Sequence, residues 1–309
     1  MKYIILIILI SLLVLVLVLH NRKSIPIHLQ KEDISITYVK EKPIVKKKIP
    51  LILHQTWKSW DSISEGVLQN ISDNLTILTD KVEYRFYDDK DCWQYIKDNF
   101  PPRVLLAYEK INPQAASAMR SDLWRYCVMY KDGGLYLDIK STIKQNPFKN
   151  LQNNDNCIMF SCGNKHCGEH YRMLLDRPHY EQWALLTAPR HPIMKEAIDK
   201  CVDNILNEYN GPVVILRPGE VGDASKYSKE IWANDAEMEL QLTRRKSKVM
   251  WISGPDMLSE AVYNSNNTNY EVWPIERFFD YKFREYLPEH LYKDMNNHYA
   301  YNNKSFYYQ

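Results

Sequence analysis

A helical pattern, a glycine turn and a short apolar strand follow one another in MRSDLWRYCVMYKDGGLYLDIK, residues 119–140. Apolar side chains recur at spacings of three and four from Leu123 to Tyr130, so they share one face of a helix. Gly133 and Gly134 predict the end of this helix, because glycine enters the left-handed backbone region at little cost. The next residues, 135–137, are apolar and strand-like.

Asp138 falls at the carboxyl end of this predicted strand. Ligands of open α/β sheets bind in the crevice beyond those ends, so the carboxylate is well placed to hold a ribose or a metal that bridges a diphosphate. Asp122 and Arg125 share a second face of the preceding helix. The alternative is an ordinary helix, turn and strand whose charges lie on the surface.

The segment resembles the core of the DXD-type glycosyltransferases, a family that includes fungal initiating α-1,6-mannosyltransferases, capsular sugar transferases and glucosylating toxins. That family usually carries S/A-D-x-x-R, a hydrophobic helix and then G-G-x-Y-x-D-x-D. The chain departs from the pattern at Lys140, which stands where the family usually has its second, metal-binding Asp. The matching residues are Ser121, Asp122, Arg125, Gly133, Gly134, Tyr136 and Asp138.

Shorter segments extend the resemblance over most of the chain from Ile49 onward. IPLILHQTW at 49–57 looks like the family's opening strand, whose end contacts the nucleotide. TAPRHP at 187–192 resembles the segment before a middle helix, and SGP at 253–255 resembles a turn of relatives. NNKSF at 302–306 is similar to a closing loop that completes the metal shell, although its Phe replaces the expected Trp.

The resemblance implies an α/β fold of the GT-A type, a mixed nucleotide-sugar-binding sheet flanked by helices. It implies transfer of a hexose or N-acetylhexosamine, with retention of configuration, from a UDP- or GDP-sugar to a hydroxyl of a glycan, glycoprotein or glycolipid. A Mn²⁺ or Mg²⁺ ion would stabilise the leaving diphosphate. The implied catalytic residues are Asp122, Arg125 and Asp138; the donor-binding residues are Gln55, Thr56, Trp57, Asp122, Arg125, Tyr136 and Asp138; the metal ligands are Asp138, Asn303 and Ser305.

Lys140 is expected to change the chemistry of the site, so we add it to the candidate catalytic residues. An ammonium group does not ligate a metal unless it is deprotonated, but it pairs well with a diphosphate. Residues two apart on a strand face the same side, so Asp138 and Lys140 are expected to point into the site together and to form an ion pair without substrate. We therefore expect weaker metal dependence than a two-carboxylate site shows.

A degenerate transferase kept as a membrane-anchored sugar-binding or scaffold protein is the alternative function.

Two residues near the opening strand have alternative roles. Trp57 is explained equally well as a core aromatic residue. His54 is expected to order the donor loop at the strand's end, and general-base catalysis is its second role.

Length and charge agree with an enzyme domain. A chain of 309 residues with 45% hydrophobic content buries a substantial core. The formal net charge of +2 and the dispersed basic residues argue against nucleic acid as a partner. The sequence contains no G-x-S-x-G elbow, phosphate-binding P-loop or H-E-x-x-H helix, so hydrolase and kinase readings lack a motif.

The apolar run from Tyr3 to Leu19 is near the minimum length of a membrane-spanning helix. A cleaved signal peptide is the rival, but no small-residue cleavage site follows the run. We therefore expect a signal anchor at residues 1–20, a stem at 21–48 and the catalytic domain at 49–309.

The orientation of this anchor is argued from two conflicting rules. The positive-inside rule places the flank with Arg22 and Lys23 in the cytosol. Relatives with this layout hold the catalytic domain in the lumen of the ER or Golgi, and we follow the relatives to predict a type II membrane protein. Glycosylation sequons then begin at Asn70, Asn74, Asn266 and Asn303.

Six cysteines raise a further alternative. Cys157, Cys162 and Cys167 lie five apart beside His166, whereas structural zinc favours pairs separated by two to four residues. A lumenal disulfide in this loop is therefore favoured over zinc. The helical patterns around the other three predict buried apolar side chains for Cys92, Cys127 and Cys201.

Further elements are predicted ahead of the core motif. Alternation predicts a strand at 83–87. Asp88 and Asp89 are expected to cap a helix that ends at Asn99. The proline pair at 101–102 predicts the start of another helix, which ends near Ile111.

Overall fold

In the computed structural model, the core motif forms helix α5 (Pro113–Lys131) and strand β3 (Gly134–Leu137), as predicted. The structure describes residues 48–79, 81–161, 179–209, 248–267, 269–280 and 305–308. Among these residues, none of the helices has the length and apolar character needed to cross a bilayer. The predicted anchor at residues 1–20 lies outside the described part of the chain.

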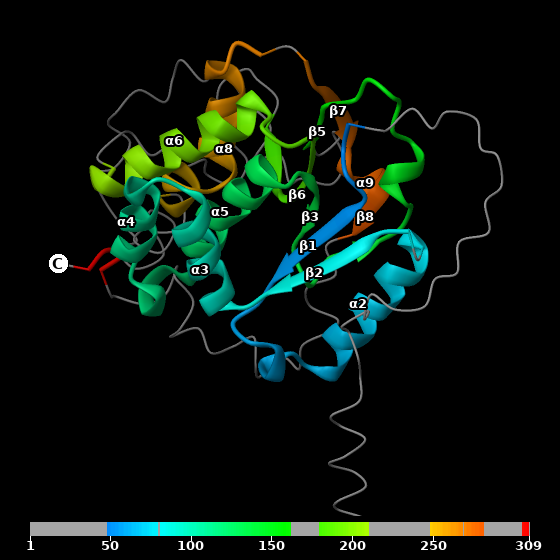
Figure 1. Cartoon of the computed structure of the whole chain (residues 1–309), viewed down its shortest axis with the longest axis horizontal. Helices are drawn as coiled ribbons and strands as arrows, with labels where there is room; N and C mark the ends of the chain where they lie inside the picture. The colour runs from blue at the N-terminus through cyan, green and yellow to red at the C-terminus, as the bar shows by residue number, and fades with distance from the viewer. Residues whose placement is uncertain are drawn as a thin grey trace, which may run out of the picture. The chain divides into compact units, whose positions relative to one another are not determined.

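The centre of the fold is a mixed sheet of strand order β2-β1-β3-β6-β5-β7 (Figure 1). β6 runs antiparallel to its neighbours β3 and β5, whereas the pairs β1–β2, β1–β3 and β5–β7 are parallel. The predicted mixed α/β fold is therefore confirmed. The remaining strands of this sheet are β1 (Ile52–Thr56), β2 (Glu83–Tyr87), β5 (Cys157–Ser161), β6 (Tyr180–Thr187) and β7 (Glu271–Pro274).

The chain leaves β1 toward both sides of the sheet. Helix α2 (Glu65–Leu78) connects β1 to β2, and helices α3 (Asp89–Asn99), α4 (Pro102–Lys110) and α5 then lead back across β1 to β3. Ligands of open α/β sheets bind beyond the carboxyl ends of the strands at such a switch point. The ends of β1 and β3 are therefore where a site is expected.

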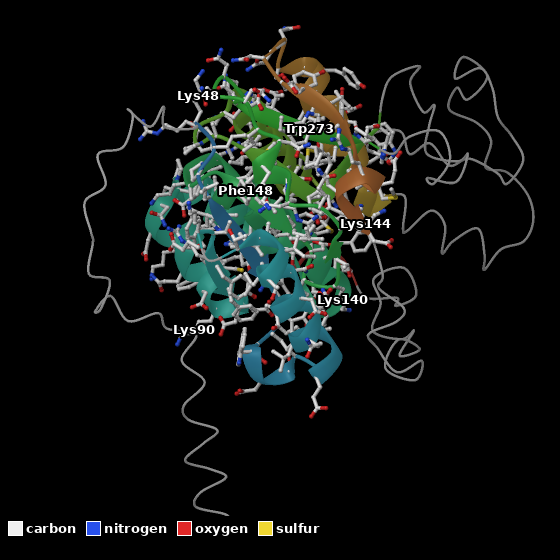
Figure 2. The ribbon with its side chains drawn as sticks, turned by 90° about the vertical axis from the view of Figure 1, so that its right-hand side faces the viewer. Lys48, Lys90, Lys140, Lys144, Phe148 and Trp273 are labelled. Atoms are coloured by element: carbon white, nitrogen blue, oxygen red, sulfur yellow. The ribbon has the colours of Figure 1, made fainter. Side chains whose placement is uncertain are left out.

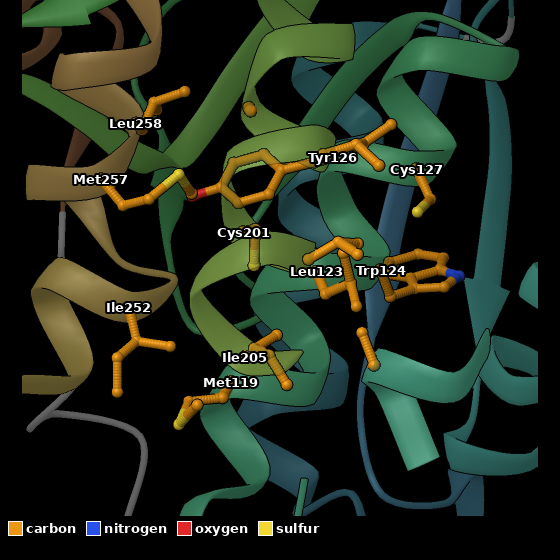
Figure 3. Packing of buried hydrophobic residues seen from close by; sticks show 14 of the residues in the cluster. Met119, Leu123, Trp124, Tyr126, Cys127, Cys201, Ile205, Ile252, Met257 and Leu258 are labelled. Carbon is orange, nitrogen blue, oxygen red and sulfur yellow. The ribbon is translucent and has the colours of Figure 1, made fainter. Parts of the chain in front are cut away.

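Separate apolar clusters cover the two faces of the sheet. The larger cluster joins α3, α4 and α5 to α6 (Pro192–Leu206) and α8 (Pro255–Asn264), and Figure 3 shows its interior around Trp124 and Tyr126. The opposite face packs against α9 (Ile275–Phe278) and the small sheet of β4 (Thr142–Ile143) and β8 (Phe279–Asp280). A third cluster holds α2 beside the ends of β1 and β3.

The glycine turn between α5 and β3 is required by its backbone and by its neighbours. Gly133 and Gly134 have φ angles of 67° and 101°, in the region that favours glycine. A Cβ atom on Gly134 would lie 2.7 Å from the carbonyl oxygen of Ile52 in β1. The turn therefore admits no larger residue and lets β3 lie close against β1.

The elements predicted ahead of the core motif are also confirmed. The strand at 83–87 is β2. Asp88 caps α3 and exchanges hydrogen bonds with Asp91 in a capping box, while Asp89 is the first helical residue. Helix α4 begins at Pro102, as the proline pair predicts.

The cysteine expectations are partly confirmed. Cys92, Cys127 and Cys201 are buried free thiols, as predicted. Cys157 was expected in a disulfide-bearing or zinc-binding loop, and this was wrong, because Cys157 is a buried free thiol that begins β5. Its Sγ lies 3.6 Å from Met159 Sδ. Cys162, His166 and Cys167 lie outside the described residues.

The glycine turn yields a stability prediction. Gly134→Ala should lower the free energy of unfolding by about 2 kcal/mol or more, because alanine would be strained at this φ and would contact Ile52. Gly66→Ala in α2 is the control, and it should be neutral or stabilising by about 0.5–1 kcal/mol. Urea unfolding of both variants measures the difference, and equal effects would contradict this account of the turn.

Candidate functional site

The segment after β3 is a turn, so one prediction made from strand geometry was wrong. β3 ends at Leu137, and the amide of Ser141 donates to the carbonyl of Asp138 over 2.8 Å. Strand alternation therefore does not set the directions of Asp138 and Lys140. Their positions come from the tertiary contacts of the turn.

Asp138 is the exposed end of a buried polar network. Its side chain is 29% exposed, and the hydroxyl of Tyr136 donates to its Oδ1 over 2.6 Å. Arg125 Nη2 lies 3.2 Å from the same Oδ1. The guanidinium of Arg125 also lies over the ring of Tyr136, 4.7 Å from its centroid. Helix α5 and strand β3 thus fix the carboxylate together.

Arg125 bridges two carboxylates. Its Nη2 lies 3.2 Å from Asp122 Oδ1 as well, and its Nη1 donates to the carbonyl of Gln182 over 3.3 Å. The side chains of Asp122 and Arg125 are 4% and 6% exposed. Burial raises the pKa of Asp122 to about 6, and the positive charge of Arg125 opposes this shift. The structure therefore brings together Asp122, Arg125, Tyr136 and Asp138. Of the two carboxylates, Asp138 is the more accessible.

Three residues of this network were not predicted. Ser253 donates from Oγ to Asp122 Oδ2 over 2.7 Å, and Gln182 Nε2 donates to Asp122 Oδ1 over 3.2 Å. The hydroxyl of Tyr126 lies 2.5 Å from Gln182 Oε1 and 2.8 Å from the carbonyl oxygen of Ser253, so the two acceptors share its single proton. The SGP turn is thus docked on α5. A glutamine among the mainly apolar residues of β6 was the signal available in the sequence.

Lys140 reaches the end of β1. Its Nζ lies 4.3 Å from the ring centroid of Trp57, within the range of a cation–π interaction. Burial lowers the pKa of Lys140 to about 8, and the Asp138 carboxylate acts in the opposite direction. Figure 2 shows Lys140 near α2, whereas Lys144 lies nearer to α9. The two parallel strands therefore place an indole and an ammonium group side by side at their carboxyl ends.

The other predicted residues of β1 have different surroundings. Gln55 is fully buried and donates from Nε2 to the carbonyl of Leu137 over 3.2 Å. Its Oε1 is buried and has no partner within the described residues. Thr56 donates to the carbonyl of Tyr87 over 2.8 Å and contacts Cys92 of α3. Trp57 is half-buried and packs against the third apolar cluster, beside α2, so it is also a core aromatic residue.

His54 has a structural role that differs from both predicted roles. It is the third residue of β1, is fully buried, and its Nε2 lies 2.8 Å from the carbonyl of Gly133. Burial lowers the pKa of His54 to about 4, so the ring is neutral at pH 7. An imidazole buried in the sheet has no access to an acceptor hydroxyl. His54 therefore anchors the glycine turn instead of the donor loop.

Two predicted glycosylation sites are incompatible with the structure. Asn70 and Asn74 lie on the buried face of α2, and both are 0% exposed. Their side chains are hydrogen-bonded to the residues that follow Asp138. Glycosylation requires an accessible amide, so these sequons were wrong as acceptor sites.

In the described part of the chain, the predicted metal ligands do not form one group. Ser305 is exposed, and its Oγ accepts from the amide of Tyr307 at the junction of α4 and α5. Asn303 lies outside the described residues. In the part of the chain that the structure describes, no group of three His, Cys, Asp or Glu side chains is arranged to hold a metal. The turn itself supplies one carboxylate, Asp138, and one ammonium group, Lys140.

Comparison with known proteins finds a family model that matches part of the chain. Residues 55–161 match the family described as the glycosyltransferase sugar-binding region containing a DXD motif. This match confirms the predicted resemblance over the range that holds Trp57, Asp122, Arg125, Asp138 and Lys140.

Two curated relatives align with about a third of this chain. An uncharacterised glycosyltransferase of Acanthamoeba polyphaga mimivirus is 29% identical over 99 residues, covering 32% of this chain and 38% of that protein. Inositol phosphoceramide mannosyltransferase 2 of Schizosaccharomyces pombe is 33% identical over 97 residues, covering 31% and 26%. The chain thus spans less than half the length of either relative. Among solved structures, PaToxG glycosyltransferase aligns with a TM-score of 0.45 and 14% identity over 71% of this chain and 70% of that chain.

The Arg125 bridge yields a second prediction. Arg125→Met should lower the free energy of unfolding by about 3–5 kcal/mol, because it leaves the Asp122 carboxylate buried without its cation. The control is Arg103→Met, which removes an ion pair to Asp203 whose side chains are 55% and 54% exposed, and it should cost less than about 1 kcal/mol. Chemical denaturation measures both, and a loss at Arg125 no larger than the control's would contradict a stabilising bridge.

Proposed function

Because residues 55–161 carry the glycosyltransferase sugar-binding region, we propose that this chain transfers a hexose or N-acetylhexosamine from a UDP- or GDP-sugar. The acceptor is a hydroxyl of a glycan, glycoprotein or glycolipid. The observation that carries the proposal is the Asp138 carboxylate, held by Arg125 and Tyr136 beyond the carboxyl end of β3. The mixed sheet with its switch point at β1 supports a fold of the GT-A type.

Asp138 is assigned to the donor's sugar and ribose hydroxyls. An ionised carboxylate is a hydrogen-bond acceptor, and a hydroxyl is its natural donor. The contacts from Arg125 and Tyr136 both fall on Oδ1, so within the described contacts Oδ2 is the oxygen that remains for a ligand. Asp122 and Arg125 are nearly inaccessible, so we assign them to holding Asp138 in place.

Lys140 and Trp57 are assigned to the nucleotide diphosphate. The indole offers a surface on which the base stacks, and the ammonium lies beside it, where the diphosphate follows. As the bond between the anomeric carbon and the diphosphate oxygen breaks, negative charge grows on the leaving group. A positive charge placed there in advance stabilises the transition state.

We further propose that the reaction retains configuration. The acceptor oxygen bonds to the anomeric carbon on the face that the diphosphate leaves, and the acceptor's proton passes to the departing oxygen. Asp122 and Asp138 are both bound to Arg125, so neither is placed as a nucleophile for a covalent intermediate. Front-face attack within the donor's ion pair requires no such nucleophile.

The divalent cation of this family would act as a Lewis acid on the diphosphate. The described residues do not form its site, and Lys140 supplies a positive charge at the turn instead. We therefore propose that turnover depends less on Mn²⁺ or Mg²⁺ than in a two-carboxylate enzyme.

The proposed location of the enzyme rests on the sequence. We propose a type II membrane protein with an anchor at residues 1–20, a stem at 21–48 and a catalytic domain at 49–309 in the ER or Golgi lumen. The apolar run at 3–19 supports the anchor, and the family supports the lumenal domain. The buried Asn70 and Asn74 give this location no support.

Release of free nucleoside diphosphate tests the proposed activity. The full chain in detergent is offered UDP- and GDP-sugars with a mixture of glycan and glycolipid acceptors. One donor should turn over, and Asp138→Asn should lower kcat/KM by about 100-fold or more, because it weakens the contacts to the donor. Asp199→Asn, on the exposed part of α6, is the matched control and should leave turnover unchanged. Binding of a donor without turnover would favour the sugar-binding alternative.

The role of Lys140 is tested with the same assay in the presence of a chelator. Wild-type turnover should fall by less than about tenfold when EDTA replaces Mn²⁺, whereas Lys140→Met should lose about 100-fold in kcat because the leaving group loses its cation. Lys144→Met is the control, since that ammonium binds the carbonyl of Glu276 on the same side of the molecule. Higher activity in Lys140→Asp with Mn²⁺ would contradict the phosphate role.

A further inference from the structure

Three side-chain amides hold the turn that carries Asp138 and Lys140. They belong to Gln55 at the end of β1 and to Asn70 and Asn74 on the buried face of α2. All three residues are 0% exposed. Asn70 and Asn74 are four residues apart in a helix, so they face the turn together.

The amides bind alternate carbonyl groups of the turn. Gln55 Nε2 donates to the carbonyl of Leu137 over 3.2 Å. Asn70 Nδ2 donates to the carbonyls of Ile139 and Ser141 over 3.1 and 3.0 Å. Asn74 Nδ2 donates to the carbonyl of Ser141 over 2.9 Å. Asp138 and Lys140 are therefore the residues that lie between the bound carbonyls.

The amide oxygens of α2 bind the next residues. Asn74 Oδ1 accepts from the amide of Ile143 over 2.7 Å. Asn70 Oδ1 accepts from the hydroxyl of Thr142 over 2.9 Å. Each of the two asparagines thus donates and accepts hydrogen bonds. We call Asn70 and Asn74 with these hydrogen bonds the clamp, which reaches from Ile139 to β4.

Asparagine is a poor choice for stability alone at these positions. The buried face of an amphipathic helix normally carries apolar residues, and asparagine is an unfavourable residue within a helix. A buried amide is tolerated when its hydrogen bonds are made, and a satisfied buried network specifies one arrangement of the chain. The clamp therefore fixes the conformation of a segment that leaves the sheet after Asp138, whose amide donates to the carbonyl of Trp183 in β6 over 2.9 Å.

We propose that Asn70 and Asn74 are positioning residues for glycosyl transfer. They hold the backbone from Ile139 to Ile143 in the arrangement that presents Asp138 and Lys140 to the donor. They touch no donor atom themselves. This inference rests on the proposed function, because it assigns a catalytic consequence to the order of the turn.

Asn70→Leu and Asn74→Leu test the clamp, because leucine keeps much of the packing volume and removes the hydrogen bonds. The control is Ile198→Ala in α6, which removes buried packing from the separate cluster on the other face of the sheet. Thr142→Val is a milder variant that removes only the hydroxyl bound to Asn70 and should fold. All proteins are compared at temperatures where thermal unfolding shows each to be fully folded.

Two readouts separate positioning from stability. Hydrogen exchange at the amide of Ile143 should become at least about tenfold faster in the asparagine variants, because the acceptor on Asn74 or the neighbouring contacts are lost. Their kcat should fall by about 10- to 100-fold with less than about a threefold change in KM, because Asp138 and Lys140 are displaced from the reacting groups. Thr142→Val should shift both readouts in the same direction, and Ile198→Ala should shift neither.

The outcomes distinguish the two proposals. Unchanged exchange at Ile143 in the asparagine variants overturns the clamp, whatever the activity of the wild-type protein. Faster exchange with unchanged kcat overturns the positioning role. If the wild-type protein turns over no donor although exchange responds as expected, the proposed function fails and the clamp on the turn is supported.

Discussion

The buried guanidinium of Arg125 connects the helical layer to the sheet at the candidate site. It lies between the carboxylates of Asp122 and Asp138, and the buried carboxylate of Asp122 would be costly to leave without this cation. The same guanidinium group also fixes how α5 approaches the sheet. Arg125 donates to the carbonyl of Gln182 in β6, the strand next to β3. The glycine turn then follows from geometry, since the chain must reverse within two residues to bring Asp138 back to Arg125.

Much of the fold could be predicted from local patterns. Helix α5, the glycine turn and β3 follow from apolar spacing and from the conformations that glycine alone adopts easily. The end of β3 could not be predicted in this way. The chain turns after Leu137 because amides from β1 and α2 bind its carbonyls, and those residues lie more than sixty positions earlier in the sequence. The same distance explains why the burial of the Asn70 sequon could not be predicted from the sequence.

The site divides in a similar way. The carboxylate at the end of β3 and the indole at the end of β1 were predictable, because parallel strands bring their carboxyl ends to one edge. Partners that come from β6 and from the turn before α8, such as Gln182 and Ser253, depend on packing that no local period encodes. The role of His54 was missed for the same reason, since its partner is the carbonyl of Gly133 and not a ligand.

The contact between Lys140 and Trp57 gives the substitution in the family motif a physical meaning. Two carboxylates and a divalent cation have charges that cancel, and so do the single carboxylate of Asp138 and the ammonium of Lys140. In the proposed reaction, a site built in the second way presents a positive group to the diphosphate from the chain itself. That group has a fixed tether and needs no coordination shell, so its position depends on the backbone of the turn. A turn held by neutral amides suits this arrangement, because hydrogen bonds to carbonyls fix the backbone without adding a charge beside Asp138 and Lys140.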